Sequence, residues 1–236
     1  MPTVVRPIMR EVFMFARSIR FAVLATSLAL PLCGHALDRG TFPVPTQDVA
    51  KAPGKLQVAV FAGGCFWGTQ SVFERVKGVK KTVVGYAGGK ASTATYDQVT
   101  TETTGHAESV EVTYDPAVIT YGGLLRIFFS VAHDPTQLNR QGPDEGTSYR
   151  SVIFFNTPEQ QRIAQAYIAQ LGAAHAFKSK IVTDVTPLKG FYRGEDYHQD
   201  YALHNPNNPY IQTCDRPKIE ALKREYPDLF VDYKGQ

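Results

Sequence analysis

One cysteine of this chain lies among residue types that together could perform redox or nucleophilic chemistry. Residues 63–68 read Gly-Gly-Cys-Phe-Trp-Gly and include the single tryptophan of the 236 residues. The glycines allow a sharp turn, and the residues after them predict a helix over 67–76. Cys65 would then lie at the first turn of a helix, where free N–H groups and the helix dipole lower a thiol pKa. A reactive thiolate and a buried, inert cysteine both remain consistent with this pattern.

A second polar group, Glu195, Asp196, His198 and Asp200, could be mistaken for a metal site. It has no second histidine at a helical spacing with a carboxylate between the two. We therefore expect a structural or supporting role for these side chains, and no metal ion.

The elements that must position these residues follow from the hydrophobic pattern. Short apolar or alternating runs predict strands over 58–61, 82–86, 109–113, 149–155 and 181–185. Helical periodicity and capping residues predict helices over 67–76, 121–131, 157–171 and 217–225. Because strands and helices alternate without a steady βαβ repeat, the pattern favours an α+β fold in which helices cover a sheet.

The first 36 residues have the order of a secretory signal peptide. A basic stretch precedes an apolar run over 21–32, and Gly34-His35-Ala36 supplies small residues before a cleavage point. The apolar run is shorter than the roughly 20 residues of a membrane span, although an uncleaved anchor is the alternative. A lipid anchor on Cys33 is disfavoured by the bulky Leu32 before it. We predict export to the bacterial periplasm, with no stable membrane insertion after cleavage.

Residues 37–55 contain several prolines and no apolar period, so we expect an extended leader before a domain that spans 56–236. The composition, 43% hydrophobic and 20% charged, excludes a disordered chain. The net charge is +3, and the four arginines and one glutamate of residues 1–36 account for all of it. The charge therefore gives no reason to expect a nucleic-acid partner.

Ordered segments along the chain resemble the peptide-methionine (S)-S-oxide reductases, the A-type methionine sulfoxide reductases. The resemblance begins at residues 64–68 and extends over roughly residues 57–230. The matching segments are 64–68, 85–86, 95–96, 105–108, 114–116, 133–135, 141–150, 195–199 and 209–211. The resemblance implies a single α+β domain built as a two-layer, ferredoxin-like sandwich.

The resemblance also implies a reaction and the residues that perform it. A cysteine thiolate attacks the sulfur of methionine sulfoxide, methionine leaves, and a sulfenic acid remains on the enzyme. The implied residues are the nucleophile Cys65, the acid Glu108, the oxygen-binding Tyr96 and Tyr149, the polar Asp144, and Phe66 and Trp67 around the substrate methyl group. No metal or other cofactor is implied, and oxidised methionine, free or in proteins, would be the substrate.

The reaction requires such a set for chemical reasons. Oxide is a poor leaving group, so a proton must reach the oxygen as the thiolate attacks. A carboxyl group near apolar walls keeps its proton at neutral pH, and phenol hydroxyls can stabilise the polarised oxygen. Each residue also has a simpler interpretation. Glu108 could be a solvated edge carboxylate, either tyrosine could serve packing, and Asp144 could make a turn.

Turnover requires reduction of the sulfenic acid, commonly by a second thiol that forms a disulfide with it. Cys214 lies in a predicted C-terminal loop, and we hypothesise that it resolves Cys65. The chain departs from family members whose Gly-rich tail contains two recycling cysteines, so direct reduction of Cys65 by an external thiol is the alternative. A thioredoxin-like protein is the expected reductant, and a monomer is the expected state.

Two other classes of protein fit parts of the pattern. In a cysteine hydrolase, His106 or His198 would activate Cys65, and no reductant would be needed. In a non-enzymatic exported binding module, Cys65 and Cys214 would form a permanent disulfide. Formation of methionine from the sulfoxide separates both classes from the reductase.

Overall fold

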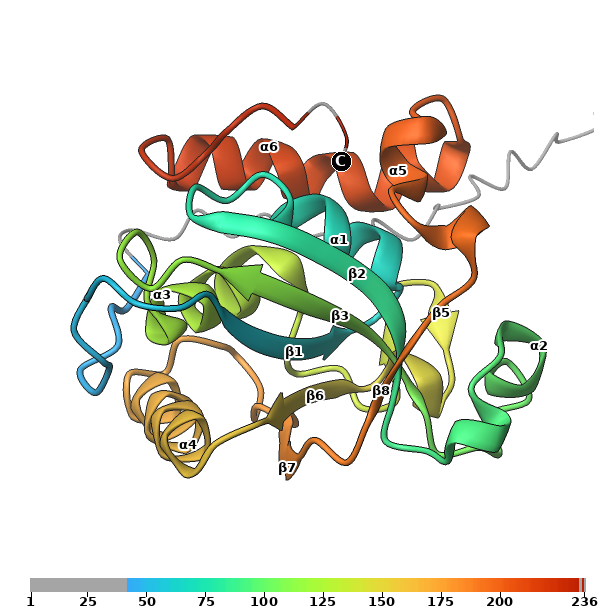
Figure 1. The fold of residues 1–236 in the computed structure, drawn as a ribbon, viewed down its shortest axis with the longest axis horizontal. Helices are drawn as coiled ribbons and strands as arrows, with labels where there is room; N and C mark the ends of the chain where they lie inside the picture. Colours follow the sequence, from blue (N-terminus) through green and yellow to red (C-terminus); the bar gives the residue numbers. More distant parts are fainter. Residues whose placement is uncertain (1–41, 234, 236) are drawn as a thin grey trace, which may run out of the picture. The chain divides into compact units, whose positions relative to one another are not determined.

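A computed structural model describes residues 42–233 and 235, which belong to one compact unit. The predicted signal peptide, residues 1–36, lies outside the described residues, as does the start of the leader. The structure has an α+β fold, in which helices pack against a twisted sheet (Figure 1). Its strands are β1 (Gln57–Gly63), β2 (Val79–Ala87), β3 (Ala107–Tyr114), β4 (Arg140–Gln141), β5 (Asp144–Glu145), β6 (Ser151–Phe155), β7 (Asp184–Pro187) and β8 (Phe191–Arg193). Its α-helices are α1 (Phe66–Phe73), α2 (Tyr96–Val99), α3 (Tyr121–Ile127), α4 (Pro158–Ala173), α5 (Tyr201–His204) and α6 (Arg216–Glu225).

The main sheet has six strands in the order β7-β6-β1-β3-β2-β8. All neighbours are antiparallel except β6 and β7, so the sheet is mixed. The inner strands β6-β1-β3-β2, with α1 after β1 and α3 after β3, have the β-α-β-β-α-β order of a ferredoxin-like unit. The α+β prediction is confirmed. The ferredoxin-like prediction holds only for these inner strands, because β7 and β8 extend the sheet at both edges.

The core behind α1 is aromatic. Phe61 of β1 stacks on Phe73 of α1 with ring centroids 5.3 Å apart, and on Phe128 with centroids 5.0 Å apart. All three side chains are fully buried, and each buried ring of this size contributes roughly 2–3 kcal/mol to stability. This packing fixes α1 against the sheet, and it thereby fixes the residue that precedes α1, Cys65.

Most predicted elements exist with shifted ends. The predicted helix 121–131 is α-helical only to Ile127 and continues as a π-helical turn over Phe128–Ala132. The strand predicted over 149–155 begins at Ser151, because Thr147–Tyr149 form a 3-10 turn, η3. The strand predicted over 181–185 is wrong at its start, since β7 begins at Asp184. The patterns did not predict the short elements α2, β4, β5, β8 and α5.

Residues 42–56 form neither helix nor strand, and hydrogen bonds hold their first part against α4 and α3. The hydroxyl of Tyr167 donates to the carbonyl of Pro43 at 2.6 Å. Asp48 accepts from the hydroxyl of Thr120 at 2.5 Å and from the backbone N–H of Gly122 at 2.9 Å. This part of the leader is therefore attached to the domain.

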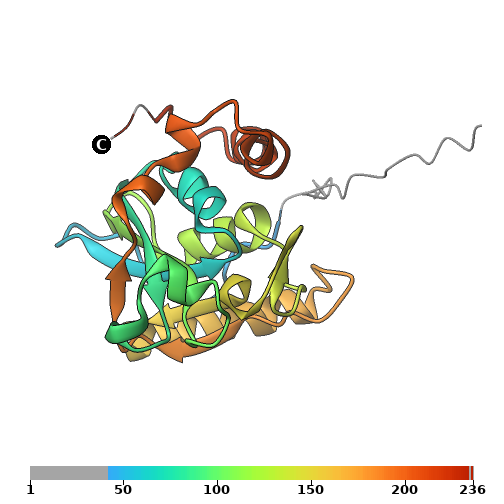
Figure 2. The same cartoon turned by 90° about the vertical axis from the view of Figure 1, so that its right-hand side faces the viewer.

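The C-terminal segment covers the side of α1 that faces away from the sheet (Figures 1 and 2). It includes α5, α6 and the π-helical turn η5, Ile211–Asp215, between them. Across the described residues, no helix is both long and apolar enough to cross a membrane. Helix α1 thus lies between the sheet and a C-terminal layer, with its N-terminal end next to both.

Candidate active site

Cys65 lies at the N-cap position of α1, where β1 turns into the helix. The turn requires Gly64, whose φ is +84° and whose Cβ, if present, would lie 2.4 Å from the side chain of Gln141. Cys65 is a free thiol with 8% of its surface exposed. The predicted placement of the cysteine at the start of a helix is therefore confirmed.

The predicted lowering of the Cys65 pKa is wrong for this structure. Burial raises the thiol pKa well above its usual range, and the nearby carboxyl groups of Glu108, Asp215 and Asp144 raise it further. The backbone N–H of Trp67, in the first turn of α1, acts in the opposite direction and lowers the pKa, as the helix-terminus argument requires. Burial and the surrounding acids outweigh it, so Cys65 is protonated in the resting protein.

Glu108 comes from β3, where it is paired with Tyr86 of β2, and its side chain is buried with only 3% of the residue exposed. Its Oε2 accepts the backbone N–H of Phe66 at 3.0 Å, which places the carboxyl group beside the residue that follows Cys65. Burial raises the pKa of Glu108 to about 8, with further contributions from Asp144 and Glu102, against the effect of the Phe66 hydrogen bond. The alternative of a solvated edge carboxylate is therefore wrong.

Tyr96 begins α2, and Tyr149 ends the turn η3. Burial raises the pKa of each hydroxyl, and the next largest contributions in both cases come from Glu108 and Cys65. Both phenols are therefore neutral hydrogen-bond donors. The structure brings together the thiol, the acid and the two tyrosines, which lie up to 84 positions apart in the chain (Tyr149 and Cys65).

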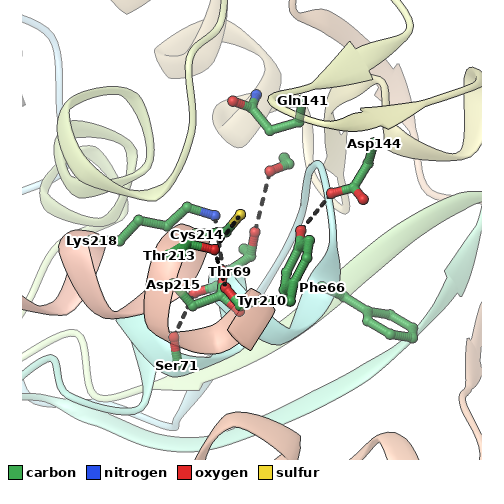
Figure 3. Close-up of polar contacts among 12 residues, drawn as sticks. Phe66, Thr69, Ser71, Gln141, Asp144, Tyr210, Thr213, Cys214, Asp215 and Lys218 are labelled. Atoms are coloured by element: carbon green, nitrogen blue, oxygen red, sulfur yellow. Dashed lines mark hydrogen bonds and ion pairs between the residues drawn. The ribbon is translucent and has the colours of Figure 1, made fainter. Parts of the chain in front are cut away.

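Asp144, on β5, joins this group through Tyr210, a residue that no local pattern in the sequence indicates. The hydroxyl of Tyr210 donates to Oδ2 of Asp144 at 2.5 Å, as Figure 3 shows. Burial raises the Asp144 pKa, although this hydrogen bond and Lys218 oppose the rise. Tyr210 belongs to the matching segment 209–211, but no sequence spacing relates it to Asp144, 66 residues away.

An aromatic wall continues from the cysteine. Phe66 is buried with its ring centroid 5.0 Å from that of His198, and Trp67 stacks on Tyr201 with centroids 3.8 Å apart. The indole N–H of Trp67 also donates to Nδ1 of His198 at 3.2 Å. The predicted apolar pair Phe66 and Trp67 thus lies beside the thiol, and the segment 198–201 supports it from outside.

The second polar group does not gather around a common point. Glu195 accepts hydrogen bonds from the hydroxyl of Tyr86 and the backbone of Tyr96, whereas Asp196 pairs with Arg193. In the part of the chain that the structure describes, no three His, Cys, Asp or Glu side chains are placed to hold a metal ion.

Neither proposed histidine is positioned to activate the thiol. Both ring nitrogens of His106 are engaged by the backbone, at Gly89 and Lys90. Nδ1 of His198 accepts from Trp67, and burial lowers the pKa of this imidazole. Within the described residues, no hydrogen bond joins an imidazole to Cys65, which removes the geometric basis for a cysteine hydrolase.

Cys214 lies in η5, which packs against α1 near the thiol end (Figure 3). The contact is close because residue 68 is glycine, and a Cβ there would lie 2.1 Å from the carboxylate of Asp215. Asp215 is fully buried and forms an ion pair with Lys218 at 3.4 Å. Because Cys65 is a free thiol, the alternative of a permanent Cys65–Cys214 disulfide is wrong.

The fold and the site together define a class of protein. A buried thiol lies among a protonated carboxyl group and two neutral phenols, and within the described residues no histidine is hydrogen-bonded to it. Such a site is suited to a cysteine-dependent oxidoreductase that must protonate an oxygen atom next to the nucleophile.

Comparison with known proteins identifies the family. Residues 57–229 match the family model described as peptide methionine sulfoxide reductase. A peptide methionine sulfoxide reductase MsrA 2 of Mesorhizobium japonicum is 55% identical over 185 residues, 78% of this chain and 94% of that protein. The MsrA 2 of Synechocystis is 54% identical over 72% of this chain and 79% of its own length.

Solved structures agree with this result. The reduced form of Mxr1 from Saccharomyces cerevisiae is 33% identical, with a TM-score of 0.60 over 71% of this chain and 98% of that one. Methionine sulfoxide reductase A of Corynebacterium diphtheriae is 35% identical, with a TM-score of 0.57 over 72% of this chain and 88% of that one. The chain belongs to the peptide methionine sulfoxide reductase family, and it is a peptide-methionine (S)-S-oxide reductase of the MsrA type.

Proposed function

We propose that Cys65 reduces methionine (S)-sulfoxide directly and that Glu108 supplies the proton to the departing oxygen. One observation is the main support for this proposal. A buried carboxyl group, with a pKa raised by burial to about 8, is hydrogen-bonded to the residue next to the cysteine. At neutral pH most Glu108 side chains therefore hold the proton that the reaction needs.

The chemical step balances without a cofactor. The Cys65 sulfur attacks the sulfoxide sulfur, the oxygen passes to Cys65, and methionine leaves. Cys65 is oxidised by two electrons to the sulfenic acid, and the substrate sulfur is reduced by two electrons. Glu108 protonates the oxygen, and the proton lost by the thiol restores the carboxyl group, so the net change is thiol plus sulfoxide to sulfenic acid plus methionine. Tyr96 and Tyr149 donate hydrogen bonds to the same oxygen as its negative charge develops.

The remaining proposed roles concern binding of the substrate. Phe66 and Trp67 provide aromatic surface for the methyl group next to the sulfur, where burial and sulfur–aromatic contacts favour it. Asp144 completes the polar side of the site, and its hydrogen bond from Tyr210 fixes the orientation of its carboxyl group.

The productive form needs one proton shared between Cys65 and Glu108, namely a thiolate next to a protonated acid. The two groups titrate together, so each apparent pKa belongs to the pair. Because the Glu108 pKa, about 8, is the lower one, kcat/KM should rise with pH toward that value and then level off. The rising part of the profile therefore reports on the loss of the first proton from the Cys65–Glu108 pair.

For turnover we propose that Cys214 resolves the sulfenic acid by condensing with it, releasing water and forming a disulfide. Because Cys214 is disulfide-bonded in the structure, this route requires prior reduction of that bond to give the thiol. The packing of η5 against α1 supports this role. A thioredoxin-like dithiol would then reduce the disulfide, and direct reduction of Cys65 by such a thiol is the competing route. Peptide mass spectrometry after one equivalent of sulfoxide distinguishes the routes. A Cys65–Cys214 disulfide is expected, and a lasting sulfenic acid with Cys214 reduced would exclude the resolving role.

The decisive assay for the catalytic roles is methionine formation from the S epimer of methionine sulfoxide with dithiothreitol. Cys65→Ser should abolish activity. Tyr96→Phe and Tyr149→Phe should each lower kcat about 100-fold, because each removes one donor to the developing oxyanion. Full activity of Cys65→Ser would refute the proposed nucleophile.

We also propose that the chain is exported, cleaved after Ala36, and acts as a monomer that repairs oxidised proteins outside the cytoplasm. The order of basic, apolar and small residues in the first 36 positions supports export. Cell fractionation and N-terminal sequencing of the full-length chain test this, and a mature chain that begins at Leu37 is expected. An intact N-terminus in the cytoplasmic fraction would contradict export, and light scattering of the purified protein tests the monomer.

A further inference from the structure

Glu102 has an unusual backbone conformation close to the active site. It lies between α2 and β3, and its φ is +63°, in the left-handed region that residues with a side chain adopt at a cost of about 1–2 kcal/mol. Such strain persists only where surrounding contacts hold it. The contacts of the Glu102 side chain identify what holds this residue.

The Glu102 carboxylate accepts three hydrogen bonds from the beginning of the turn η3. Oε2 accepts from the hydroxyl of Thr147 at 3.0 Å and from the backbone N–H of Ser148 at 2.7 Å. Oε1 accepts from the hydroxyl of Ser148 at 2.6 Å. The carboxylate approaches so closely that a Cβ on Gly146 would lie 2.4 Å from its carbon, and Gly146 itself has a φ of +135°.

This turn contains two of the proposed site residues. Asp144 lies two positions before Gly146, and Tyr149 is the last residue of η3. The hydrogen bonds of Glu102 are one cross-link between the loop before β3 and this turn, and Arg150 forms a second one. The guanidinium of Arg150 donates to the carbonyls of Thr147 and His106 through Nη1, at 2.7 and 2.9 Å, and to that of Gly105 through Nη2 at 2.9 Å.

The two cross-links join the loop that leads into Glu108 to the turn that ends at Tyr149. Removal of the Arg150 contacts would release backbone carbonyls, whereas removal of the Glu102 carboxylate would release the beginning of η3 itself. The Glu102 carboxylate thus holds the beginning of η3. The backbone of Glu102 itself is in a strained conformation that glycine would adopt without cost.

We propose that Glu102 is a positioning residue for the reduction: its carboxylate holds the turn that places Tyr149 and Asp144 beside Cys65. This inference rests on the roles proposed above for those two residues. An additional electrostatic effect accompanies it. Burial is the main cause of the raised Glu108 pKa, and the charges of Asp144 and Glu102 add to it. Arg150 is the cation that faces Glu102.

Two substitutions separate position from charge. Glu102→Gly removes the carboxylate and fits the left-handed backbone, so the protein should fold while η3 loses its support. We expect kcat to fall about 10- to 100-fold with a smaller change in KM, as for a misplaced catalytic group. Glu102→Gln keeps one acceptor oxygen and removes the charge, so kcat should fall less.

The pH profile provides a measurement that a purely structural role would not change. In both variants the rising part of kcat/KM should move to lower pH by about 0.3 unit, because Glu108 loses a neighbouring negative charge. Glu145→Gln is the matched control. Glu145 is an exposed acid next to Asp144 on the β4–β5 hairpin, and it forms an ion pair with Arg140. The kinetics of this control should equal those of the wild type.

Three results separate the inference from the proposal on which it rests. If Tyr149→Phe lowers kcat but both Glu102 variants keep wild-type kcat and pH profile, the positioning role is wrong. The same conclusion follows if the Glu102 variants lose only thermal stability. If Tyr149→Phe itself has wild-type kcat, the proposed function of Tyr149 fails, independently of Glu102.

Discussion

Helix α1 has a buried carboxyl group with a raised pKa at each of its ends. At the N-terminal end, burial raises the pKa of Glu108 to about 8. At the C-terminal end, burial raises the pKa of Glu74 to about 9, and Asp200 adds to the rise against the effect of Arg75. Titration alone therefore does not distinguish the two acids.

Their surroundings distinguish them. Glu108 faces the thiol of Cys65 and the phenols of Tyr96 and Tyr149, which are groups that can react or donate. Glu74 lies against Asp200, whose carboxylate accepts from Gln70 at 3.2 Å and from Tyr233 at 3.2 Å. That second cluster ties α1 to the C-terminal segment and contains no nucleophile.

The comparison shows why a perturbed pKa is an incomplete guide to function. Burial in a fold produces protonated acids wherever a carboxyl group is enclosed. What identifies Glu108 as the proposed acid is its hydrogen bond to the residue next to Cys65. Substitutions at the two ends of the helix test this difference.

The largest expected effect comes from replacing each acid by its amide. Glu108→Gln removes the proton that must reach the oxygen, so methionine formation should slow about 100- to 10,000-fold. Glu74→Gln should stay within about twofold of the wild type, because no reacting group lies near it. Single-turnover methionine formation at pH 7 measures both. Equal losses in the two variants would mean that enclosure of an acid near α1, and not its position beside Cys65, sets the rate.

A smaller effect, on folding stability and not on the rate, is expected at the N-terminal end of α1. There the protein should lose stability as the pH falls. His133 lies next to Gly63, and burial lowers its pKa to about 4. Its ring nitrogens form hydrogen bonds with the carbonyl of Phe128 and the hydroxyl of Ser151. The unfolded chain binds this proton below pH 6.5 and the folded protein does not. Stability should therefore fall by about 3 kcal/mol as the pH drops from 6.5 to 4.

Urea unfolding of His133→Gln and of the wild type across this range tests the assignment. The variant should lose less stability with acidification, because its side chain does not titrate. If the stability of both proteins changes in parallel with pH, another group is responsible for the acid sensitivity.

The smallest effect concerns Glu74 and the stability of its end of the helix. The folded protein keeps the Glu74 proton up to about pH 9, whereas the unfolded chain releases it near 4.5, so this group makes stability decline as the pH rises between those values. Glutamine stays neutral and removes that decline. The unfolding free energy of Glu74→Gln, relative to the wild type, should therefore increase by about 2 kcal/mol from pH 5 to 6.5. A constant difference over that interval would show that Glu74 does not hold a proton in the folded state.

The sequence was sufficient to predict the features that depend on residues close together in the chain. The glycines before Cys65 and the periodicity after it were sufficient to place the cysteine at the start of a helix, and alternation identified β3 with Glu108 near its beginning. The joint role of Glu108, Tyr96, Tyr149 and Asp144 came only from resemblance to a family, because no spacing rule relates residues on separate elements.

Long-range packing explains the failures. The helix-terminus argument gave the wrong direction for the Cys65 pKa, since the acids around the thiol come from β3, β5 and η5. Tyr210 and Glu102 were missed because their partners lie 66 and about 45 residues away, and neither residue type indicates its partner. The start of β7 was misplaced because its pairing with β6 is determined by the sheet and not by local composition.

The central claim is that reduction of the sulfoxide requires the proton of Glu108 in addition to the Cys65 thiolate, so that more thiolate without this proton does not speed the reaction. Because Glu108 contributes to the raised Cys65 pKa, Glu108→Gln should lower that pKa and increase the thiolate fraction at pH 8. The most direct test measures thiolate by its absorbance near 240 nm together with single-turnover methionine formation. More thiolate with at least a 100-fold slower reaction is the predicted result. A rate that rises in proportion to the thiolate would contradict the account.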